Sequence, residues 1–236
     1  MAMATTFDRK VFFDAVRRQP FGGSMSQQQV DGMDIILNQW EHQALSSDLR
    51  WLAYMFATTF HETARTMWPI SEYGKGAGHD YGEKDPETGQ TYYGRGFVQL
   101  TWRDNYARAT DKLGLIGNRD IEWHADMALD LEIASNVMFR GMAEGWFTGK
   151  RLDQYFSETA DDPVNARAII NNDVSKMGKT IAGYHQNFLD ALDAAVIEEV
   201  LPPEPGFDVV HVNIQAPPGI SVSVAINGEI IVAGPG

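Results

Sequence analysis

The sequence predicts a mainly α-helical domain followed by a small β element at the C-terminal end. Apolar residues recur at helical spacing through most of the first 200 residues, between capping residues, Gly and Pro. The composition changes at LPPEPG, residues 201–206, beyond which β-branched residues alternate with others. We therefore expect one helical domain over residues 1–200, a Pro-rich linker over 201–206, and a small β tail over 207–236.

The stretch from Ser46 to Pro69 predicts a central, buried helix. Its first residues, Ser-Ser-Asp, are N-cap candidates, and Trp68-Pro69 is the predicted stop. Apolar residues cover nearly every face between them, which is typical of a helix surrounded by protein. Glu62 lies in the last turns of this stretch, and a poorly solvated carboxyl holds its proton more firmly. Glu62 is therefore a candidate general acid.

Capping signals and periodicity predict the other helices. A short amphipathic helix is expected over Phe7–Arg18, and a second opens at Ser26, which has capping-box spacing with Gln29. Later helices are expected over residues 103–113, 124–147 and 163–170, and from the turn at 171–173 to about 200.

Residues 70–90 predict a long irregular loop, because they hold one Pro, many charges, and Gly at 74, 76, 78, 82 and 89. Loops of this length inside a domain are usually functional. The alternating Gly residues do not follow a predicted strand or open a helix, which disfavours a phosphate cradle. The loop carries several carboxylates, and aromatic residues crowd the same region.

The C-terminal tail predicts a β-hairpin. Alternating apolar residues over 210–214 and 220–226 indicate strands, and Asn227-Gly228 predicts a tight turn into Glu229–Val232. A sheet of about 30 residues with one apolar face does not stand alone. We expect the tail to dock on the helical domain or on another subunit.

The composition excludes several classes of protein. A net charge of −13 argues against a nucleic-acid partner and against attraction to anionic membranes, and the absence of Cys excludes thiol catalysis and Cys-based zinc sites. No apolar run approaches the roughly 20 residues of a membrane helix. The first residues lack the apolar core of a signal peptide, so we expect synthesis in the cytoplasm and no membrane insertion.

Carboxylate chemistry is favoured over metal or serine chemistry. HETAR, residues 61–65, lacks the second His of the zinc motif, and no Gly-x-Ser-x-Gly elbow is present. We therefore expect no metal and no cofactor. A glycosidase needs one carboxylic acid for the leaving oxygen and a second group for the water or the intermediate. Glu62 and the acidic loop supply such a pair, while the aromatics either stack on sugars or pack the loop.

The motif His61-Glu62-Thr63, followed by YYGRGFVQLTW at 92–102 and by Asn105-Tyr106, resembles the family-19 glycoside hydrolases. More narrowly it is similar to the phage and prophage endolysin branch, which FGGSMSQQQVDGM, EGWFTGK and IINN also fit. The resemblance covers about residues 7–198. It implies a lysozyme-like, two-lobed helical domain with a cleft, which hydrolyses β-1,4 bonds between N-acetylhexosamines with inversion.

By position in the motif, Glu62 is the general acid, and a second carboxylate should activate water across the sugar, in pairs about 6.5–9.5 Å apart. Glu72 is the first choice because endolysin relatives place an acidic residue about this far after the helix, and Glu83 is the reserve. Thr101 matches the residue that orients the water, but with Asp104 it also has capping-box spacing, and both roles stay open.

The resemblance also implies substrate-binding residues: His61, Tyr93, Arg95, Gln99, Asn105 and Asn171. For Arg95 the alternative is bracing of the loop against a carboxylate, and for His61 it is a structural place or the orientation of Glu62. Asn171 begins Asn-Asn-Asp where the family usually has Asn-Gly, so a simple turn is its alternative. The family's Arg at the start of the last helix has no clear match, since Lys179 or Thr180 falls near it.

The branch resemblance favours peptidoglycan glycan strands as the substrate, reached after a holin or cell lysis releases a bacteriolytic enzyme. A chitinase is the alternative. A different class is a catalytically inactive glycan-binding or phage structural module, which the presence of Glu62 and YYGRGFVQLT disfavours. The β tail is then a docking element, a self-association strand or a wall-binding element.

Overall fold

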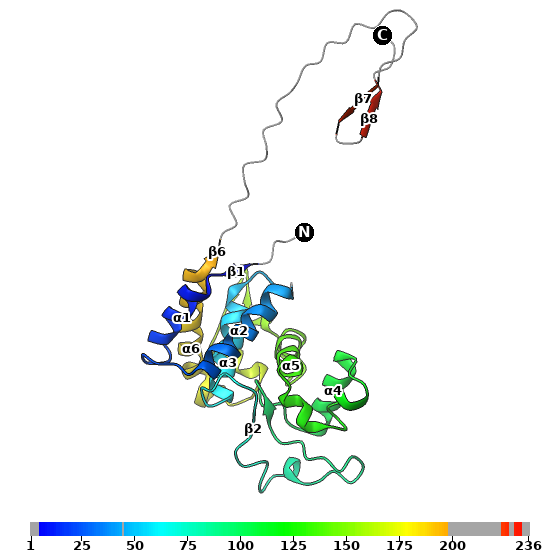
Figure 1. The fold of residues 1–236 in the computed structure, drawn as a ribbon. Coiled ribbons are helices and arrows are strands. Elements are labelled where there is room, and N and C mark those ends of the chain that lie inside the picture. Colours follow the sequence, from blue (N-terminus) through cyan, green and yellow to red (C-terminus); the bar gives the residue numbers. More distant parts are fainter. Residues whose placement is uncertain (1–4, 44, 198–222, 227–228, 233–236) are drawn as a thin grey trace, which may run out of the picture. The chain divides into compact units, whose positions relative to one another are not determined.

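The computed structural model describes residues 5–43, 45–197, 223–226 and 229–232. The chain divides into two compact units, Met1–Glu198 and Glu199–Gly236, which are described separately. The first unit is mainly helical, as predicted (Figure 1). Its described residues form six α-helices: α1 Arg9–Arg18, α2 Gln27–His42, α3 Leu49–Glu62, α4 Arg103–Leu113, α5 Leu131–Glu144 and α6 Val174–Ala195.

The described residues of this unit also form three antiparallel pairs of two-residue strands: β1 Thr6–Phe7 with β6 Val196–Ile197, β2 Ile70–Ser71 with β3 Arg95–Gly96, and β4 Phe156–Ser157 with β5 Ala160–Asp161. Short 3-10 helices complete the described part: η1 Asp80–Gly82, η2 Gly117–Arg119, η3 Ala125–Leu129, η4 Leu152–Gln154 and η5 Asn165–Ile169. The β2–β3 pair closes the base of the long loop, which extends away from the helices in Figure 1.

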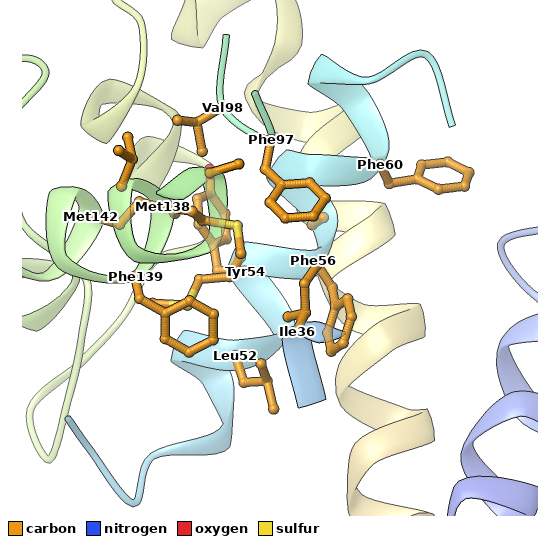
Figure 2. Packing of buried hydrophobic residues seen from close by; sticks show 14 of the residues in the cluster. Ile36, Leu52, Tyr54, Phe56, Phe60, Phe97, Val98, Met138, Phe139 and Met142 are labelled. Carbon is orange, nitrogen blue, oxygen red and sulfur yellow. The ribbon is translucent and has the colours of Figure 1, made fainter. Parts of the chain in front are cut away.

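Helix α3 forms the centre of the core, which confirms the prediction of a buried helix. Every residue from Leu52 to Phe60 is buried, and α3 packs most extensively against α6. Phe56 stacks on Phe188 of α6 with ring centroids 5.2 Å apart. Figure 2 shows Leu52 and Phe56 packed near Ile36 of α2 and Phe139 of α5. Truncation of such a buried Phe to Ala costs about 3–5 kcal/mol of stability.

Helix α3 ends at Glu62, six residues before the predicted stop at Trp68, so that boundary was predicted wrongly. Ala64, Arg65 and Met67 have positive φ angles of 50°, 68° and 54°, which turn the chain out of the helix. Glu62 is thus the last residue of the buried helix α3.

The turn after α3 is stabilised by contacts with α2. Gln29 Nε2 donates to the carbonyl oxygen of Arg65 at 2.8 Å. Gly32 lies directly on Met67, since a Cβ at Gly32 would be 1.8 Å from the Met67 carbonyl oxygen. A side chain at position 32 would therefore displace the turn that exposes the end of α3.

Helix α4 covers residues 103–113 as predicted, and the capping box between Ser26 and Gln29 is present at the start of α2. Helix α1 begins at Arg9 rather than Phe7, because Asp8 accepts a hydrogen bond from the Val11 amide and caps the helix there. Val11 of this helix is 39% exposed although it is apolar.

The long helix expected over residues 124–147 is a 3-10 helix followed by the shorter α5. Asp130 breaks the two apart, because its side chain accepts from the Ile133 amide and caps α5. Gly145, with φ 78°, ends the helix in the left-handed conformation. The helix expected over 163–170 is likewise only the 3-10 helix η5, and α6 ends at Ala195 rather than near Val200.

The long loop is fastened to α4 by a charged cluster. Arg103, the first residue of α4, forms ion pairs with Asp85 at 3.2 Å, with Glu87 at 2.8 Å and with Glu122 at 2.8 Å. Asp85 also accepts hydrogen bonds from the amides of Glu87 and Thr88, which fix the turn of the loop. This part of the loop is therefore an ordered wall.

In the second unit, β7 Ser223–Ile226 pairs antiparallel with β8 Glu229–Val232, and Ile226 lies opposite Glu229. This is the pairing that the predicted hairpin requires. The linker at 201–206, the alternation at 210–214 and the turn at 227–228 lie outside the described residues, and the role of the tail stays a prediction. None of the helices in the described ranges has the length and apolar character needed to cross a bilayer.

His185 of α6 is buried among aromatic rings. It is 2% exposed, stacks on Phe156 with centroids 5.1 Å apart and lies 5.7 Å from the Tyr54 ring. Neither ring nitrogen has a hydrogen-bond partner among the described residues. Burial lowers the pKa of His185 from 6.5 to about 4, despite nearby Asp48 and Asp161.

We predict that His185→Phe removes a pH-dependent loss of stability. The unfolded chain binds the proton near pH 6.5 while the folded chain resists it until about pH 4. The free energy of unfolding should thus fall by about 3 kcal/mol as the pH drops through this window. Urea unfolding at pH 7.5 and 4.5 measures the fall. It should shrink in His185→Phe and persist in His124→Phe, an exposed control; equal falls in both variants contradict the assignment.

Candidate active site

A pocket of about 360 Å³ lies at the end of α3. Its walls come from α3, the loop before α4, α4 itself, the turn after α5 and the segment before α6. It is lined by Glu62, Tyr81, Val98, Gln99, Leu100, Thr101, Trp102, Asn105, Phe147, Ile170 and Asn171. The fold therefore brings together Glu62, Gln99, Thr101, Asn105 and Asn171, five of the residues selected from the sequence.

Glu62 is held by Arg167, a residue that the sequence analysis did not select. Arg167 Nη1 donates to Glu62 Oε1 at 2.5 Å, and its Nε donates to Asp173 Oδ1 at 2.6 Å. The Arg167 side chain is 4% exposed. Burial opposes its charge, but the two carboxylates outweigh burial and raise the pKa of Arg167. A buried cation between two carboxylates fixes the position of each.

The contact with Arg167 leaves one oxygen of Glu62 for the pocket. Oε1 accepts from Arg167, while Oε2 accepts no hydrogen bond from any described residue. The Glu62 side chain is 14% exposed. Oε2 is therefore the Glu62 oxygen that a ligand in the pocket can meet.

Thr101 lines the pocket and does not cap α4. The N-cap of α4 is Trp102, which makes no side-chain capping bond, so the capping-box alternative is wrong. The Thr101 hydroxyl instead donates to the Gln99 carbonyl oxygen at 2.8 Å. Its lone pairs remain available to accept from a water, and that role stays a prediction.

Gln99 and Asn105 use part of their amide groups within the protein. Gln99 Nε2 donates to the carbonyl oxygens of Ile70 at 3.1 Å and Gly96 at 3.3 Å. Asn105 Nδ2 donates to the Thr101 carbonyl oxygen at 2.8 Å. Both side chains therefore shape the pocket wall, and their contacts with a sugar stay predictions.

The backbone of the pocket wall is strained at two residues. Gln99 and Trp102 have backbone φ angles of 52° and 74°, which residues other than Gly rarely adopt. Gly94 makes room for this turn, since a Cβ there would be 2.8 Å from Gln99 Oε1. Such strain concentrates at functional sites, where the surrounding structure maintains it.

Three of the residues selected as substrate-binding, Arg95, Tyr93 and His61, do not line the pocket. Arg95 is 3% exposed and pairs with Asp126 at 2.9 Å. Its guanidinium lies 3.7 Å from the centre of the Tyr93 ring, which is 8% exposed. This is the bracing arrangement expected as the alternative for Arg95. His61 is half-buried next to Glu62 and is not part of the pocket wall.

Neither candidate base is among the residues that line the pocket with Glu62, but both lie near Tyr81 of its wall. Glu72 Oε2 accepts from the Gly94 amide at 3.2 Å, and Glu72 contacts Tyr81, where burial and the nearby carboxylate raise the pKa of the phenol. Glu83 lines a neighbouring pocket of about 260 Å³ that shares Tyr81 and Trp102 with the first. The assignment of the base to Glu72, with Glu83 as the reserve, stays a prediction.

Aromatic rings form one edge of the pocket, where Trp102 is exposed and Tyr81 is half-buried. Trp102 is 51% exposed and meets Tyr81 edge to face, with centroids 5.1 Å apart. Tyr81 in turn stacks on His79 at 4.9 Å. Amphipathic rings of this kind offer both apolar faces and polar edges to a ligand such as a sugar.

The first unit has the fold of family-19 chitinases. A bacterial family 19 chitinase superposes with a TM-score of 0.50 at 20% identity, over 79% of this chain and 94% of that one. Chitinase C from Streptomyces griseus gives 0.52 at 16% identity, over 82% and 78%. A chitinase C mutant gives 0.52 at 18% identity, over 79% and 92%. The predicted family-19, lysozyme-like fold is confirmed.

Two curated proteins match part of the chain. Chitinase 5 and Chitinase 4 of Oryza sativa subsp. japonica are each 38% identical to it over 76 residues, which is 30% of this chain and 26% of each relative. The chain thus matches about a quarter of the length of these relatives. No protein-family model matches the sequence. These similarities are to chitinases, and the endolysin branch stays a prediction.

We predict that Arg167→Gln lowers the free energy of unfolding by about 3 kcal/mol, because Glu62 and Asp173 lose their shared counter-charge. The double variant Glu62→Gln/Arg167→Gln should recover part of this loss. Urea unfolding at pH 7 measures both.

Arg151→Gln is the matched control, since it breaks an exposed pair with Asp153 and should cost less than about 1 kcal/mol. An Arg167 variant as stable as this control would contradict a structural role for the buried bridge.

Proposed function

We propose that the protein is a glycoside hydrolase that cleaves β-1,4 bonds between N-acetylhexosamines with inversion. The observation that carries the proposal is the position of Glu62, the last residue of a buried helix, in a pocket that also contains Thr101 and Asn171. The family-19 chitinase fold supports it. The aromatic edge formed by Trp102 and Tyr81 supports a sugar as the ligand.

In the proposed mechanism, Glu62 donates a proton from Oε2 to the glycosidic oxygen as the bond to the anomeric carbon breaks. Glu72 removes a proton from a water that Thr101 orients, and that water attacks from the opposite face. Arg167 stabilises the Glu62 carboxylate that the proton transfer leaves behind. This contact strengthens as charge develops, which is the condition for lowering the barrier.

Two polymers fit the proposed reaction. Chitin is supported by the comparisons, since the similar proteins are chitinases. Peptidoglycan is supported by the motif resemblance to the endolysin branch. For the second substrate, the proposal includes release of the enzyme from the cytoplasm by a holin or by lysis, and a docking, self-association or wall-binding role for the β tail.

We predict that Glu62→Gln lowers the turnover number at least about 100-fold on chitin hexasaccharide or on isolated sacculi, because the amide cannot donate the proton. The first product of the wild-type enzyme should carry the α configuration at its new reducing end, seen by NMR. Glu158→Gln, an exposed control, should leave the rate unchanged. A Glu62→Gln variant that retains the wild-type rate would refute the mechanism with Glu62 as the general acid, and a wild-type protein that binds glycans without cleaving them would identify a binding module.

We predict that Glu72→Gln also lowers the turnover number at least about 100-fold, whereas Glu83→Gln changes it less than about tenfold. The reason is that one carboxylate must take the proton from the attacking water, and only the carboxylate next to that water can do so. Initial rates on the same substrate distinguish the two. The opposite ranking would assign the base to Glu83.

A further inference from the structure

A second pocket, of about 440 Å³, adjoins the catalytic pocket. It lies between the C-terminal half of α4 and the turn after α5, and it is lined by Arg108, Lys112, Glu144, Gly145, Trp146, Phe147, Thr148 and Gly149. Phe147 lines both pockets. Its ring lies directly on Gly141, where a Cβ would be 2.3 Å from the ring. The two pockets are therefore neighbours that share the Phe147 side chain.

Two cations, Arg108 and Lys112, line this second pocket together with one acid, Glu144. Arg108 and Lys112 are one turn apart on α4, and both are exposed. Arg108 donates to the neutral side chain of Asn105 at 3.3 Å and to the carbonyl oxygen of Trp146. Within the described ranges, neither cation forms an ion pair. Their charge is thus available to a ligand, in a chain whose net charge is −13.

The single acid of the pocket wall is already neutralised. Glu144 accepts from Arg140 Nε at 2.9 Å and from Trp146 Nε1 at 2.9 Å. Burial opposes the charge of Glu144, but the hydrogen bonds from Trp146 and Arg140, with the nearby charges of Arg140 and Lys112, outweigh burial and lower its pKa. The pocket consequently presents positive charge from Arg108 and Lys112.

Arg108 links the second pocket to the catalytic pocket through a hydrogen bond. Its partner Asn105 lines the pocket that contains Glu62. An anionic group on a sugar near the reacting bond would meet the guanidinium and the ammonium at one end of the groove. Arg and Lys bind carboxylates through charge-assisted hydrogen bonds, which also fix orientation.

We propose that the Arg108/Lys112 pocket is a subsite for a carboxylate carried by the glycan. The preferred substrate is then an anionic N-acetylhexosamine polymer of the peptidoglycan type rather than neutral chitin. This inference rests on the proposed hydrolase function and names its substrate class. The carboxylate has two sources in peptidoglycan, the stem peptide and the lactyl group that amidase treatment uncovers.

The test compares Lys112→Glu with the wild-type full chain on three soluble substrates: chitin hexasaccharide, glycan strands with stem peptides, and the same strands after amidase treatment. We expect kcat/KM to fall about tenfold on the anionic strands at low salt and to stay within about twofold on chitin. The fall should shrink as salt is raised, since salt screens exposed charges. The strand type with the larger fall identifies which carboxylate binds.

Lys10→Glu is the control, because it makes the same charge change on α1, outside the residues that line these pockets. Equal effects of Lys112→Glu on all substrates, no effect on any, or the same selective loss in Lys10→Glu would overturn the subsite. So would a wild-type enzyme that cleaves chitin and leaves both kinds of strand intact. A wild-type protein inactive on all three substrates would instead refute the hydrolase itself.

Discussion

The contact between Glu62 and Arg167 is the interaction on which the site depends. It joins the last residue of α3 to a residue 105 positions later, and Arg167 passes the constraint on to Asp173 before α6. Because α3 and α6 also form the most extensive helix packing of the unit, the ion pair lies at the end of a rigid two-helix core. A carboxyl fixed in this way needs little reorganisation when it transfers a proton.

The opposite wall of the pocket is built on a loop, and the loop is made rigid by a different set of contacts. Glu72 and Gly94 bond to each other in both directions at its base. Arg95 is buried against Tyr93, and Arg103 gathers the carboxylates of Asp85 and its neighbours. The proposed acid and the candidate base are therefore held in place differently. The acid lies at the end of a packed helix, and the candidate base lies on a loop that ion pairs and hydrogen bonds stabilise.

The sequence predicted correctly those features of the fold that depend on interactions between residues close together in the chain. The capping box of α2, the limits of α4 and the buried character of α3 follow from neighbouring residues, and the sequence predicted each of them. The end of α3 was predicted wrongly because the turn depends on Gly32, which is distant in sequence and leaves space for Met67. Arg167 was missed for the same reason, since nothing near it in the chain indicates a partner on α3. The motif resemblance selected Arg95 together with the pocket residues, because a motif does not distinguish residues that line a pocket from residues that hold the lining in place.

The pairing of β1 with β6 has an architectural consequence. Thr6 lies opposite Ile197, and the Asp8 amide donates to the Ala195 carbonyl oxygen at 2.7 Å, so the first and last segments of the helical unit leave it from one anchor point. Any module joined in front of residue 6 and any module joined behind residue 197 would share that anchor. The residues of this anchor, β1 and β6, are not among those that line the catalytic pocket.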